Sequence, residues 1–449
     1  MIDVCVIGGG PAGAITALEL TRLGYSTKLM CLSSKRGDWP EAVSPRLPPM
    51  LDQLGLASVV NCSAYTDIVE KRVQWGSGDQ PKRLFYPGGT IVSRELLDRA
   101  LITAASTAGV DLVHAAAGLP AQQPDGTWQI PIERESQRIR ARFVVFASGR
   151  RKVPFGGTYA AGARRIALHG FTRTCKMMPG TMVVANAATC WHWGVSLPGG
   201  TYHALAFVRA RSLAEPPITT LQRSLPQETK WELLTFHGAA DATARAAQEP
   251  VGQGWIRVGD AFFAADPLSS SGLYIAALTA VQAARVINTM LRRPRDAIAA
   301  IEFYKNVQQQ MISHFTTTTA GFYDADQNGA PGVTSSSPRE LLPALGDLVI
   351  SPSIQVRLVP TLTNDLVSMG VGVCHPNQPP SAFFEGIPVV RLLAPLQAGK
   401  SVAEALNDWT DLPGQDRARF VQFLVENGLV IEKSTEIIRE AGRIRGFHD

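Results

Sequence analysis

Three glycines near the start of the chain, Gly8, Gly10 and Gly13, have the spacing of a turn that binds dinucleotides. They follow a short apolar run at residues 2–7 and open a segment, residues 12–23, whose apolar residues have helical spacing. In such a turn the first glycine allows the tight bend, the second lets the backbone approach a pyrophosphate, and the third lets the helix pack on the strand. The N-terminus of the helix favours the negative charge. The pattern predicts a dinucleotide site at Gly8, Gly10, Pro11, Ala12 and Gly13.

One residue of this motif is missing. The second strand, at residues 26–32, normally ends in an acidic residue that binds the adenosine ribose. Counting from Gly24, that position is occupied by Cys31. Ser33 or Ser34 could supply hydrogen bonds instead, so we include Ser33 among the predicted cofactor residues.

A second candidate segment lies far downstream. Residues 254–261 read as a strand that ends in Gly-Asp, and Asp-Pro at 266–267 leads through three serines to an apolar helix from about Tyr274 to Ile287. This combination resembles the flavin end of the FAD-dependent monooxygenases and halogenases that share the para-hydroxybenzoate hydroxylase fold. The resemblance implies that the cofactor is FAD and that the residues contacting it include Gly259, Asp260, Pro267, Ser270, Ser271, Gly272 and Leu273.

The resemblance also assigns roles within this segment. Asp260 would bind a ribityl hydroxyl, and Pro267 would lie near the flavin ring. The backbone of residues 270–273 would face the N1 and O2 edge, where N–H groups at a helix N-terminus stabilise the anion of reduced flavin.

Two further segments match the same family. Residues 88–110 read as an amphipathic helix entered by Arg94, which the resemblance places against the phosphates or ribose of the cofactor; an ordinary solvated arginine is the alternative. Residues 143–150 resemble the strand and turn that return to the adenine side, with Ala-Ser-Gly-Arg in place of the more usual Ala-Thr-Gly-Arg.

The branch of the family is less clearly marked. Trp191 and Trp193 resemble the tryptophan pair of flavin-dependent halogenases, but the Ile-Pro of that element is absent. The pair is equally consistent with a strand that carries two aromatic residues on one face. Lys71 is the candidate for the lysine of a halogenase, although its surroundings match poorly, and the glutamate of tryptophan halogenases is replaced by Ser269.

A smaller branch matches residues 39–45 and 51–56. Its members mature quinone cofactors built from tryptophan side chains, such as the cysteine tryptophylquinone of quinohemoprotein amine dehydrogenase. That resemblance implies a monooxygenase that hydroxylates a peptidyl tryptophan through a flavin C4a-hydroperoxide, with a tryptophan-bearing protein or peptide as substrate. Glu41, His169 and His192 are candidates for the base that removes the proton, because their segments border the expected flavin face.

Two alternatives remain open. One is a halogenase of an aromatic substrate that uses Lys71, and the other is an FAD oxidoreductase without oxygen insertion. The sequence contains no second glycine motif for a nicotinamide, so the electrons could come from a separate flavin reductase or from transiently bound NAD(P)H.

These segments require an α/β architecture. We expect a Rossmann-like FAD domain of the glutathione-reductase type, built from residues of about 1–60, 88–155 and 250–290, with an inserted β-rich substrate domain at about 61–87 and 156–249. Residues 329–338 have the composition of a linker and end this part near residue 330. Residues 331–449 would form a small β and helical domain that resembles winged-helix modules, with helices at 389–398, 401–407 and 414–426 and Ser401 as an N-cap.

The composition excludes several other classes. Of the 449 residues, 45% are hydrophobic, which is enough for large cores and argues against disorder. The net charge of +5 is too small to indicate nucleic-acid binding, and lysine and arginine do not cluster in the C-terminal helices. The six cysteines and eight histidines lack metal-ligand spacing, so we expect no metal. We also expect no membrane segment and a cytoplasmic location.

Overall fold

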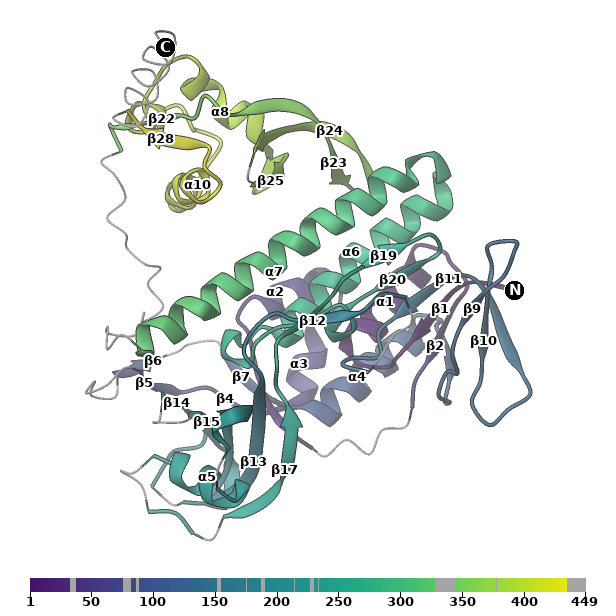
Figure 1. The fold of residues 1–449 in the computed structure, drawn as a ribbon, viewed down its shortest axis with the longest axis vertical. Helices are drawn as coiled ribbons and strands as arrows, with labels where there is room; N and C mark the ends of the chain where they lie inside the picture. Colours follow the sequence, from purple (N-terminus) through teal and green to yellow (C-terminus); the bar gives the residue numbers. More distant parts are fainter. Residues whose placement is uncertain are drawn as a thin grey trace, which may run out of the picture. The chain divides into compact units, whose positions relative to one another are not determined.

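The computed structural model describes residues 1–32, 38–75, 82–85, 89–151, 155–174, 176–186, 190–213, 215–226, 230–232, 234–327, 345–376 and 378–433. The chain divides into two compact units (Figure 1). The first unit comprises Met1–Asn288 and Met311–Val333, and the second comprises Thr289–Gln310 and Thr334–Asp449. The long helices α6 (Gly272–Arg292) and α7 (Ala297–Gln327) each contribute residues to both units.

A mainly parallel sheet forms the centre of the first unit. Its strand order is β19-β20-β11-β1-β2-β8, and the pairs from β20 to β8 all run parallel. The apolar run at residues 2–7 becomes the central strand β1 because it can be buried from both sides. The bounds are β1 Ile2–Ile7, β2 Thr27–Met30, β8 Asp111–Val113, β11 Arg138–Phe146, β19 Val251–Gly252 and β20 Trp255–Arg257, with β9 Ala121–Gln122 and β10 Trp128–Pro131 attached to β11.

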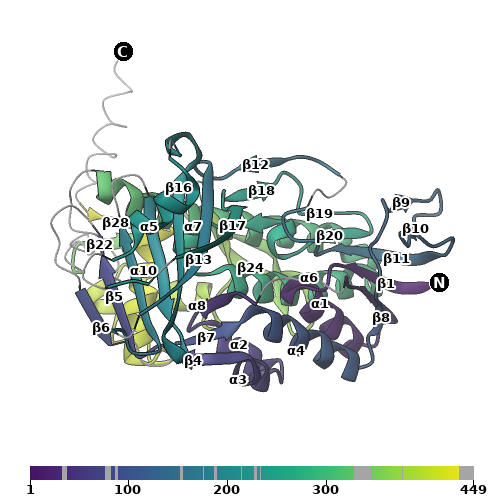
Figure 2. The ribbon, with the colours of Figure 1, turned by 90° about the horizontal axis from the view of Figure 1, so that it is seen from below.

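Helices α1 (Pro11–Arg22) and α4 (Arg94–Thr107) lie beside each other next to this sheet (Figure 2). The sequence predicted a helix through residues 88–110, but residues 90–93 instead form strand β7 (Thr90–Ser93). Ser93 then caps α4, because its side chain accepts the N–H of Leu96 at 3.1 Å. Strand β7 pairs with β3 (Pro40–Val43) and β4 (Ala64–Asp67), and α2 (Leu47–Gln53) and α3 (Ala57–Ser63) connect these two strands.

The first unit also contains a seven-stranded sheet of order β17-β13-β16-β15-β14-β5-β6. Its strands are β5 Glu70–Gln74, β6 Lys82–Phe85, β13 Arg165–Arg173, β14 Thr181–Asn186, β15 Cys190–Ser196, β16 Thr201–Arg209 and β17 Thr235–Asp241. One face packs on helix α5 (Pro217–Ser224) through Leu168, Ala204 and Leu221. We call the opposite face the aromatic face; it carries Trp75, His169, Phe171, Trp191, Trp193, His203 and Phe207. A small sheet of β12 (Thr158–Ala160), β18 (Arg245–Ala247) and β21 (Phe263–Ala264) completes the unit.

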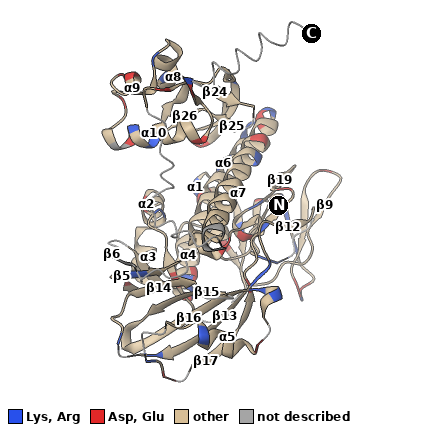
Figure 3. Cartoon of the chain, turned by 60° about the vertical axis from the view of Figure 1, so that its left-hand side comes forward, with Lys and Arg blue, Asp and Glu red and all other residues tan. Residues whose placement is uncertain are grey.

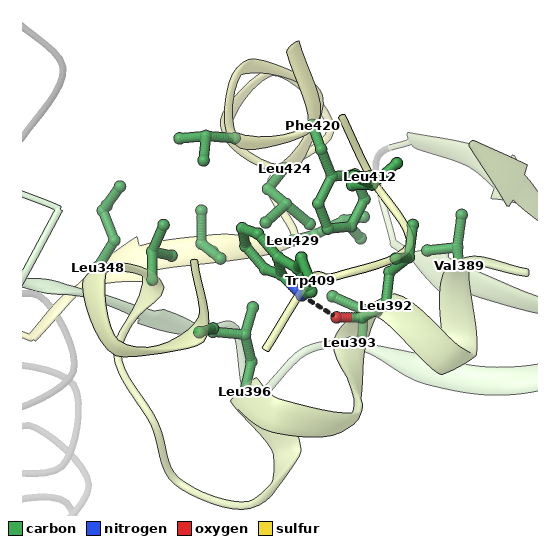
Figure 4. Packing of buried hydrophobic residues seen from close by; sticks show 14 of the residues in the cluster. Leu348, Val389, Leu392, Leu393, Leu396, Trp409, Leu412, Phe420, Leu424 and Leu429 are labelled. Atoms are coloured by element: carbon green, nitrogen blue, oxygen red, sulfur yellow. Dashed lines mark hydrogen bonds between the residues drawn. The ribbon is translucent and has the colours of Figure 1, made fainter. Parts of the chain in front are cut away.

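The second unit is organised around Trp409, which is 2% exposed and donates its indole N–H to the carbonyl of Leu392 at 2.6 Å (Figure 4). The three helices expected here are confirmed, and Ser401 forms a capping box with Glu404. They are α8 Val389–Gln397, α9 Val402–Ala405 and α10 Gly414–Glu426. The strands are β22 Leu348–Ile350, β23 Gln355–Thr363, β24 Leu366–His375, β25 Gln378–Ser381, β26 Phe383–Phe384, β27 Ile387–Pro388 and β28 Val430–Glu432.

Basic and acidic side chains are interspersed on the helices of this unit (Figure 3). Several of them form ion pairs, namely Arg391–Asp411, Lys400–Asp408, Arg419–Glu385 and Arg419–Asp416. The absence of a nucleic-acid partner stays a prediction.

One helix of the described chain, α6, is long and apolar enough to cross a membrane by length and composition. Because 67% of its most apolar window is buried within the protein, it has the environment of a core helix.

Candidate functional site

The glycine turn lies at the carboxyl edge of the parallel sheet, directly after β1. Gly8 has a φ of +120°, and a Cβ placed on it would lie 2.3 Å from the carbonyl oxygen of Ala147, at the end of β11. A Cβ on Gly13 would lie 1.8 Å from the carbonyl oxygen of Gly8, so this glycine lets α1 pack against the turn. A Cβ on Gly10 would meet no protein atom within 4 Å. The sterics therefore match the three roles that the spacing predicts, with open space beside the second glycine.

The distant Gly-Asp segment reaches the same edge of the sheet. Gly259, two residues after the end of β20, has a φ of +57°, and a Cβ on it would lie 2.8 Å from the Cβ of Ala12 in the first turn of α1. Its N–H donates to the hydroxyl of Thr279 in α6 at 2.9 Å. The neighbouring Asp260 has a 41% exposed side chain whose carboxylate lies 3.5 Å from the Nε of Arg150. Residues about 250 positions apart in the sequence thus lie together at the carboxyl edge of the parallel sheet.

The loop before α6 has a defined backbone. Asp266 caps a short 3₁₀ turn at Pro267–Ser269, and Ser270 adopts a left-handed conformation with a φ of 49°. The hydroxyl of Ser271 donates to the carbonyl of Ser269 at 2.8 Å, and α6 begins at Gly272 with Leu273 buried behind it. The first-turn N–H groups of a helix have no partner within the helix and carry its positive partial charge. The loop therefore offers the donors that an anionic ring edge requires. We call residues 266–273 the flavin loop.

A buried cluster of Arg165, Asp266 and Tyr323 anchors the start of the flavin loop. The Asp266 carboxylate lies 3.5 Å from the Nε of Arg165 and accepts the hydroxyl of Tyr323 at 3.0 Å. The guanidinium carbon of Arg165 lies 3.8 Å from the centre of the Tyr323 ring. Arg165 and Asp266 are 5% and 7% exposed. The sequence analysis did not find this cluster, because its three residues lie on separate segments.

Cys31 lies at the carboxyl end of β2, where the motif normally has an acid. Its Sγ atom is 3.6 Å from the Nδ1 of His114, and burial raises the pKa of the thiol. The position therefore has no carboxylate for a ribose. Ser33, the predicted substitute, lies outside the described residues.

Arg94 and Glu41 bind each other. The Nη1 of Arg94 is 2.8 Å from a carboxylate oxygen of Glu41, and its Nε is 2.8 Å from the carboxylate of Asp98. Arg94 was predicted to contact the cofactor and Glu41 to act as a base. In the structure, the guanidinium is held by two carboxylates and the Glu41 carboxylate is held by a cation, so a role for either in the reaction stays a prediction.

Of the predicted catalytic histidines, His169 lies on the aromatic face. Trp39 contacts it edge-on, with ring centres 4.1 Å apart, and His237 from β17 lies 6.5 Å away. Burial and the charge of His237 lower the pKa of His169. Next to them, His203 is 2% exposed and stacks on Phe171 at 4.6 Å. The sequence analysis missed His203 and His237. The signal that could have found them is strand alternation, which places every second residue of a strand on the same face.

His192 lies on the opposite face of the sheet, which corrects its expected place beside the flavin. Its imidazole is fully buried between the hydroxyls of Tyr202, at 2.9 Å, and Ser224 in α5, at 3.2 Å. Strand alternation explains this, because Trp191 and Trp193 face one side and the residue between them faces the other. Its contacts are those of a structural residue.

This burial predicts a pH dependence of stability. Burial lowers the pKa of His192 to about 3, whereas the imidazole titrates near 6.5 in an unfolded chain. Between these values only the unfolded chain takes up the proton on His192, so the contribution of His192 to the free energy of unfolding decreases as the pH falls below about 6.5 and is constant above it. We expect His192→Gln to remove a slope of about 1.4 kcal/mol per pH unit between about pH 4 and 5.5. Urea unfolding at several pH values measures this, with His237→Gln as the control for loss of an exposed histidine; an unchanged slope would contradict the assignment.

Lys71 lies on β5, in register with Met182 of β14. Alternation places it on the aromatic face together with Val73 and Trp75, and burial lowers the pKa of its ammonium group. The two predicted tryptophans share this face; Trp191 stacks on Phe207 at 4.0 Å. Leu268 of the flavin loop packs in the same cluster as Trp191 and Trp193. The aromatic face and the flavin loop are therefore neighbours.

These residues fit FAD. The open space at Gly10 and the N-terminus of α1 suit a pyrophosphate, Asp260 is an exposed carboxylate suited to a hydroxyl, and the start of α6 suits the edge of a ring that becomes anionic. When bound, FAD would supply redox chemistry at this site.

Comparisons with known proteins agree with this reading. Residues 1–190 match the family described as FAD binding domain. The tryptophan 2-halogenase of Chondromyces crocatus is 24% identical over 361 residues, which cover 72% of this chain and 68% of the halogenase.

Solved structures extend the similarity over nearly the whole chain. The peptidyl tryptophan dihydroxylase QhpG, which is essential for tryptophylquinone cofactor biogenesis, is 26% identical with a TM-score of 0.69, covering 95% of this chain and 99% of that one. The flavin-dependent halogenase CmlS, at 15% identity, shares the fold with a TM-score of 0.77 and covers 96% of this chain and 95% of its own. The chain is therefore an FAD-binding protein that is similar over most of its length to FAD-dependent monooxygenases and halogenases.

Proposed function

We propose that this protein is an FAD-dependent monooxygenase that hydroxylates the indole ring of a tryptophan in a protein or peptide, as a step in the maturation of a tryptophan-derived quinone cofactor. The observation that carries the proposal is the match to the peptidyl tryptophan dihydroxylase over 95% of the chain, which includes the second unit. The matched Chondromyces enzyme also has tryptophan as its named substrate. Both comparisons favour an indole as the reacting ring.

The residues of the site fit this chemistry. The flavin loop would fix the cofactor edge, while the apolar side chains of Trp191, Trp193 and Leu268 would exclude water from the reacting oxygen. His169, half-buried on the same face, is the remaining candidate to accept the proton that the hydroxylated carbon loses, because Glu41 is held by Arg94 and His192 faces away.

The domain assignment follows from the same proposal. Residues 1–330 would hold the glutathione-reductase-type FAD domain with the seven-stranded sheet as an inserted substrate domain. The small C-terminal domain at 331–449, winged-helix-like in our interpretation, would contact the protein substrate. Electrons would come from a separate flavin reductase or from NAD(P)H.

A halogenase of an aromatic substrate is the second candidate. Two observations favour it: the identity to the tryptophan 2-halogenase, and the placement of Lys71 on the aromatic face, where a lysine could deliver an electrophilic halogen. An FAD oxidoreductase without oxygen insertion is the third.

Mass spectrometry distinguishes the three. A tryptophan-bearing protein encoded beside this gene is co-expressed with and without the flavoprotein, in air and with bromide. We expect mass gains of one or two oxygen atoms on one tryptophan, unchanged by Lys71→Ala. A bromine isotope doublet that Lys71→Ala abolishes would establish the halogenase. An unmodified partner in the presence of reduced, FAD-loaded protein would exclude the quinone-cofactor assignment.

A further inference from the structure

Three side chains of the aromatic face, together with His237 of β17, surround the ring of Trp39. We propose that this indole cage, formed by His169, Phe171, His203 and His237, is the site where the enzyme holds the indole of its substrate, that Trp39 fills it in the substrate-free protein, and that His203 is the hydrogen-bond acceptor for the indole N–H. The inference rests on the proposed function and names the residues that select its substrate.

The cage already fits an indole. Trp39 meets His169 edge-on at 4.1 Å, stacks near Phe171 at 6.2 Å, and has ring centres of His203 and His237 at 6.0 and 6.2 Å. Edge-on and offset arrangements are the favourable ones for aromatic rings. The cage therefore holds the ring system of the proposed substrate in this structure.

Trp39 does not provide a hydrogen-bond partner for the ring nitrogens of His203. Its imidazole is 2% exposed, and neither ring nitrogen has a hydrogen-bond partner within the described part of the chain. Leaving such groups without partners costs free energy, so a buried orphan of this kind points to a missing ligand. Burial lowers the pKa of His203 to about 3, so the ring is neutral and one nitrogen is an acceptor. An indole has one polar hydrogen, on its nitrogen, which matches one acceptor.

Trp193 connects the cage to the cluster against which the flavin loop packs. Trp193 contacts the edge of His203, with ring centres 6.0 Å apart, and packs in the same cluster as Leu268, the residue after Pro267. Trp193 therefore borders the cage on one side and the cluster that includes Leu268 of the flavin loop on the other.

Trp39 can leave the cage without a change of fold. Its carbonyl accepts the N–H of Arg94 at 2.9 Å, which fixes the backbone at the entry to β3 and α4. In the proposal, the ring moves out by rotation about the side-chain bonds while this backbone contact is kept. A tryptophan of the substrate would enter as the side chain of Trp39 rotates away.

Binding to oxidised, FAD-loaded protein tests the proposal without turnover, so the result is independent of whether hydroxylation occurs. The probes are indole and 1-benzothiophene, which has nearly the same shape but no N–H, measured by calorimetry. We expect Trp39→Ala to bind both probes more tightly than the wild type and to prefer indole by about tenfold, which corresponds to one hydrogen bond. Adding His203→Phe should abolish the preference, whereas adding His237→Phe should keep it.

A second measurement does not depend on the Trp39 variant. In the wild type, N-acetyltryptophanamide should bind about tenfold more tightly than its benzothienylalanine counterpart, and His203→Phe should remove this difference while leaving the FAD content unchanged. The His203→Phe protein should unfold at the same or a higher temperature, since it loses orphaned polar atoms. Equal affinity for the two probes, a preference that survives His203→Phe, or weaker binding by Trp39→Ala than by the wild type would each overturn the proposal.

Discussion

Gly10→Val is expected to give a protein that folds with wild-type stability but no longer retains FAD. A Cβ at this position meets no protein atom within 4 Å, and the backbone is extended, with φ −76° and ψ 179°, so the substitution strains nothing in the protein itself. The same space is where a pyrophosphate would approach the N-terminus of α1. A valine side chain in this space would collide with the pyrophosphate, so the affinity for FAD should fall about 100-fold. The flavin content after gel filtration and the urea midpoint of the FAD-free protein measure the two effects.

Gly13→Ala provides the contrast. Its new Cβ would lie 1.8 Å from the carbonyl oxygen of Gly8, so the turn and the helix must move apart. We expect a loss of about 2–3 kcal/mol in the free energy of unfolding of the FAD-free protein. Gly414→Ala in the second unit, where a Cβ also meets nothing within 4 Å, controls for the substitution as such. Full FAD retention by Gly10→Val would show that the pyrophosphate lies elsewhere.

The cofactor half of the site could be predicted because its signals are local in the sequence. The turn at Gly8–Gly13 combines its strand, glycines and helix within about twenty residues. In the structure Gly8 and Gly13 leave no room for a Cβ, whereas Gly10 borders open space. The flavin loop is likewise continuous from Asp266 to Leu273, and its helix begins at Gly272, close to the start expected near Tyr274. The prediction that the cofactor is FAD is confirmed by the comparisons with known proteins.

The substrate half could not be predicted to the same extent, because strand pairing determines which residues meet. Alternation alone places His192 opposite Trp191 and Trp193, but the sequence does not say which face packs on α5 and which faces the flavin loop. The cage around Trp39 joins strands β13, β16 and β17 through antiparallel pairings between residues up to about 75 positions apart. Arg94 and Glu41 show the same limit, since their ion pair depends on β3 lying beside β7.

Arg165→Met is expected to lower the free energy of unfolding by about 3–5 kcal/mol and to speed the release of FAD. Arg165 is 5% exposed and is the cation facing the buried Asp266 carboxylate, and its guanidinium also covers the ring of Tyr323 at 3.8 Å. Methionine keeps most of the volume but leaves the carboxylate buried without its counter-charge, which is the costly way to break a buried ion pair. Asp266 also accepts the N–H of Leu268 at 3.0 Å, so the flavin loop should loosen with it.

Three further variants distinguish the effect of losing the positive charge of Arg165 from the effect of losing its side-chain packing. Arg165→Met with Asp266→Asn should recover part of the loss, because the amide needs no counter-charge. Tyr323→Phe removes a single hydrogen bond to Asp266 and should cost about 1 kcal/mol. Arg140→Met breaks a surface pair in which Arg140 and Asp125 are 53% and 51% exposed, and should cost less than about 1 kcal/mol. Urea unfolding and the rate of FAD loss on dilution measure all four proteins. If Arg165→Met costs no more than Arg140→Met, the cluster behind the flavin loop does not support it, and the conformation of the loop must arise from the cap at Asp266 and the left-handed Ser270 alone.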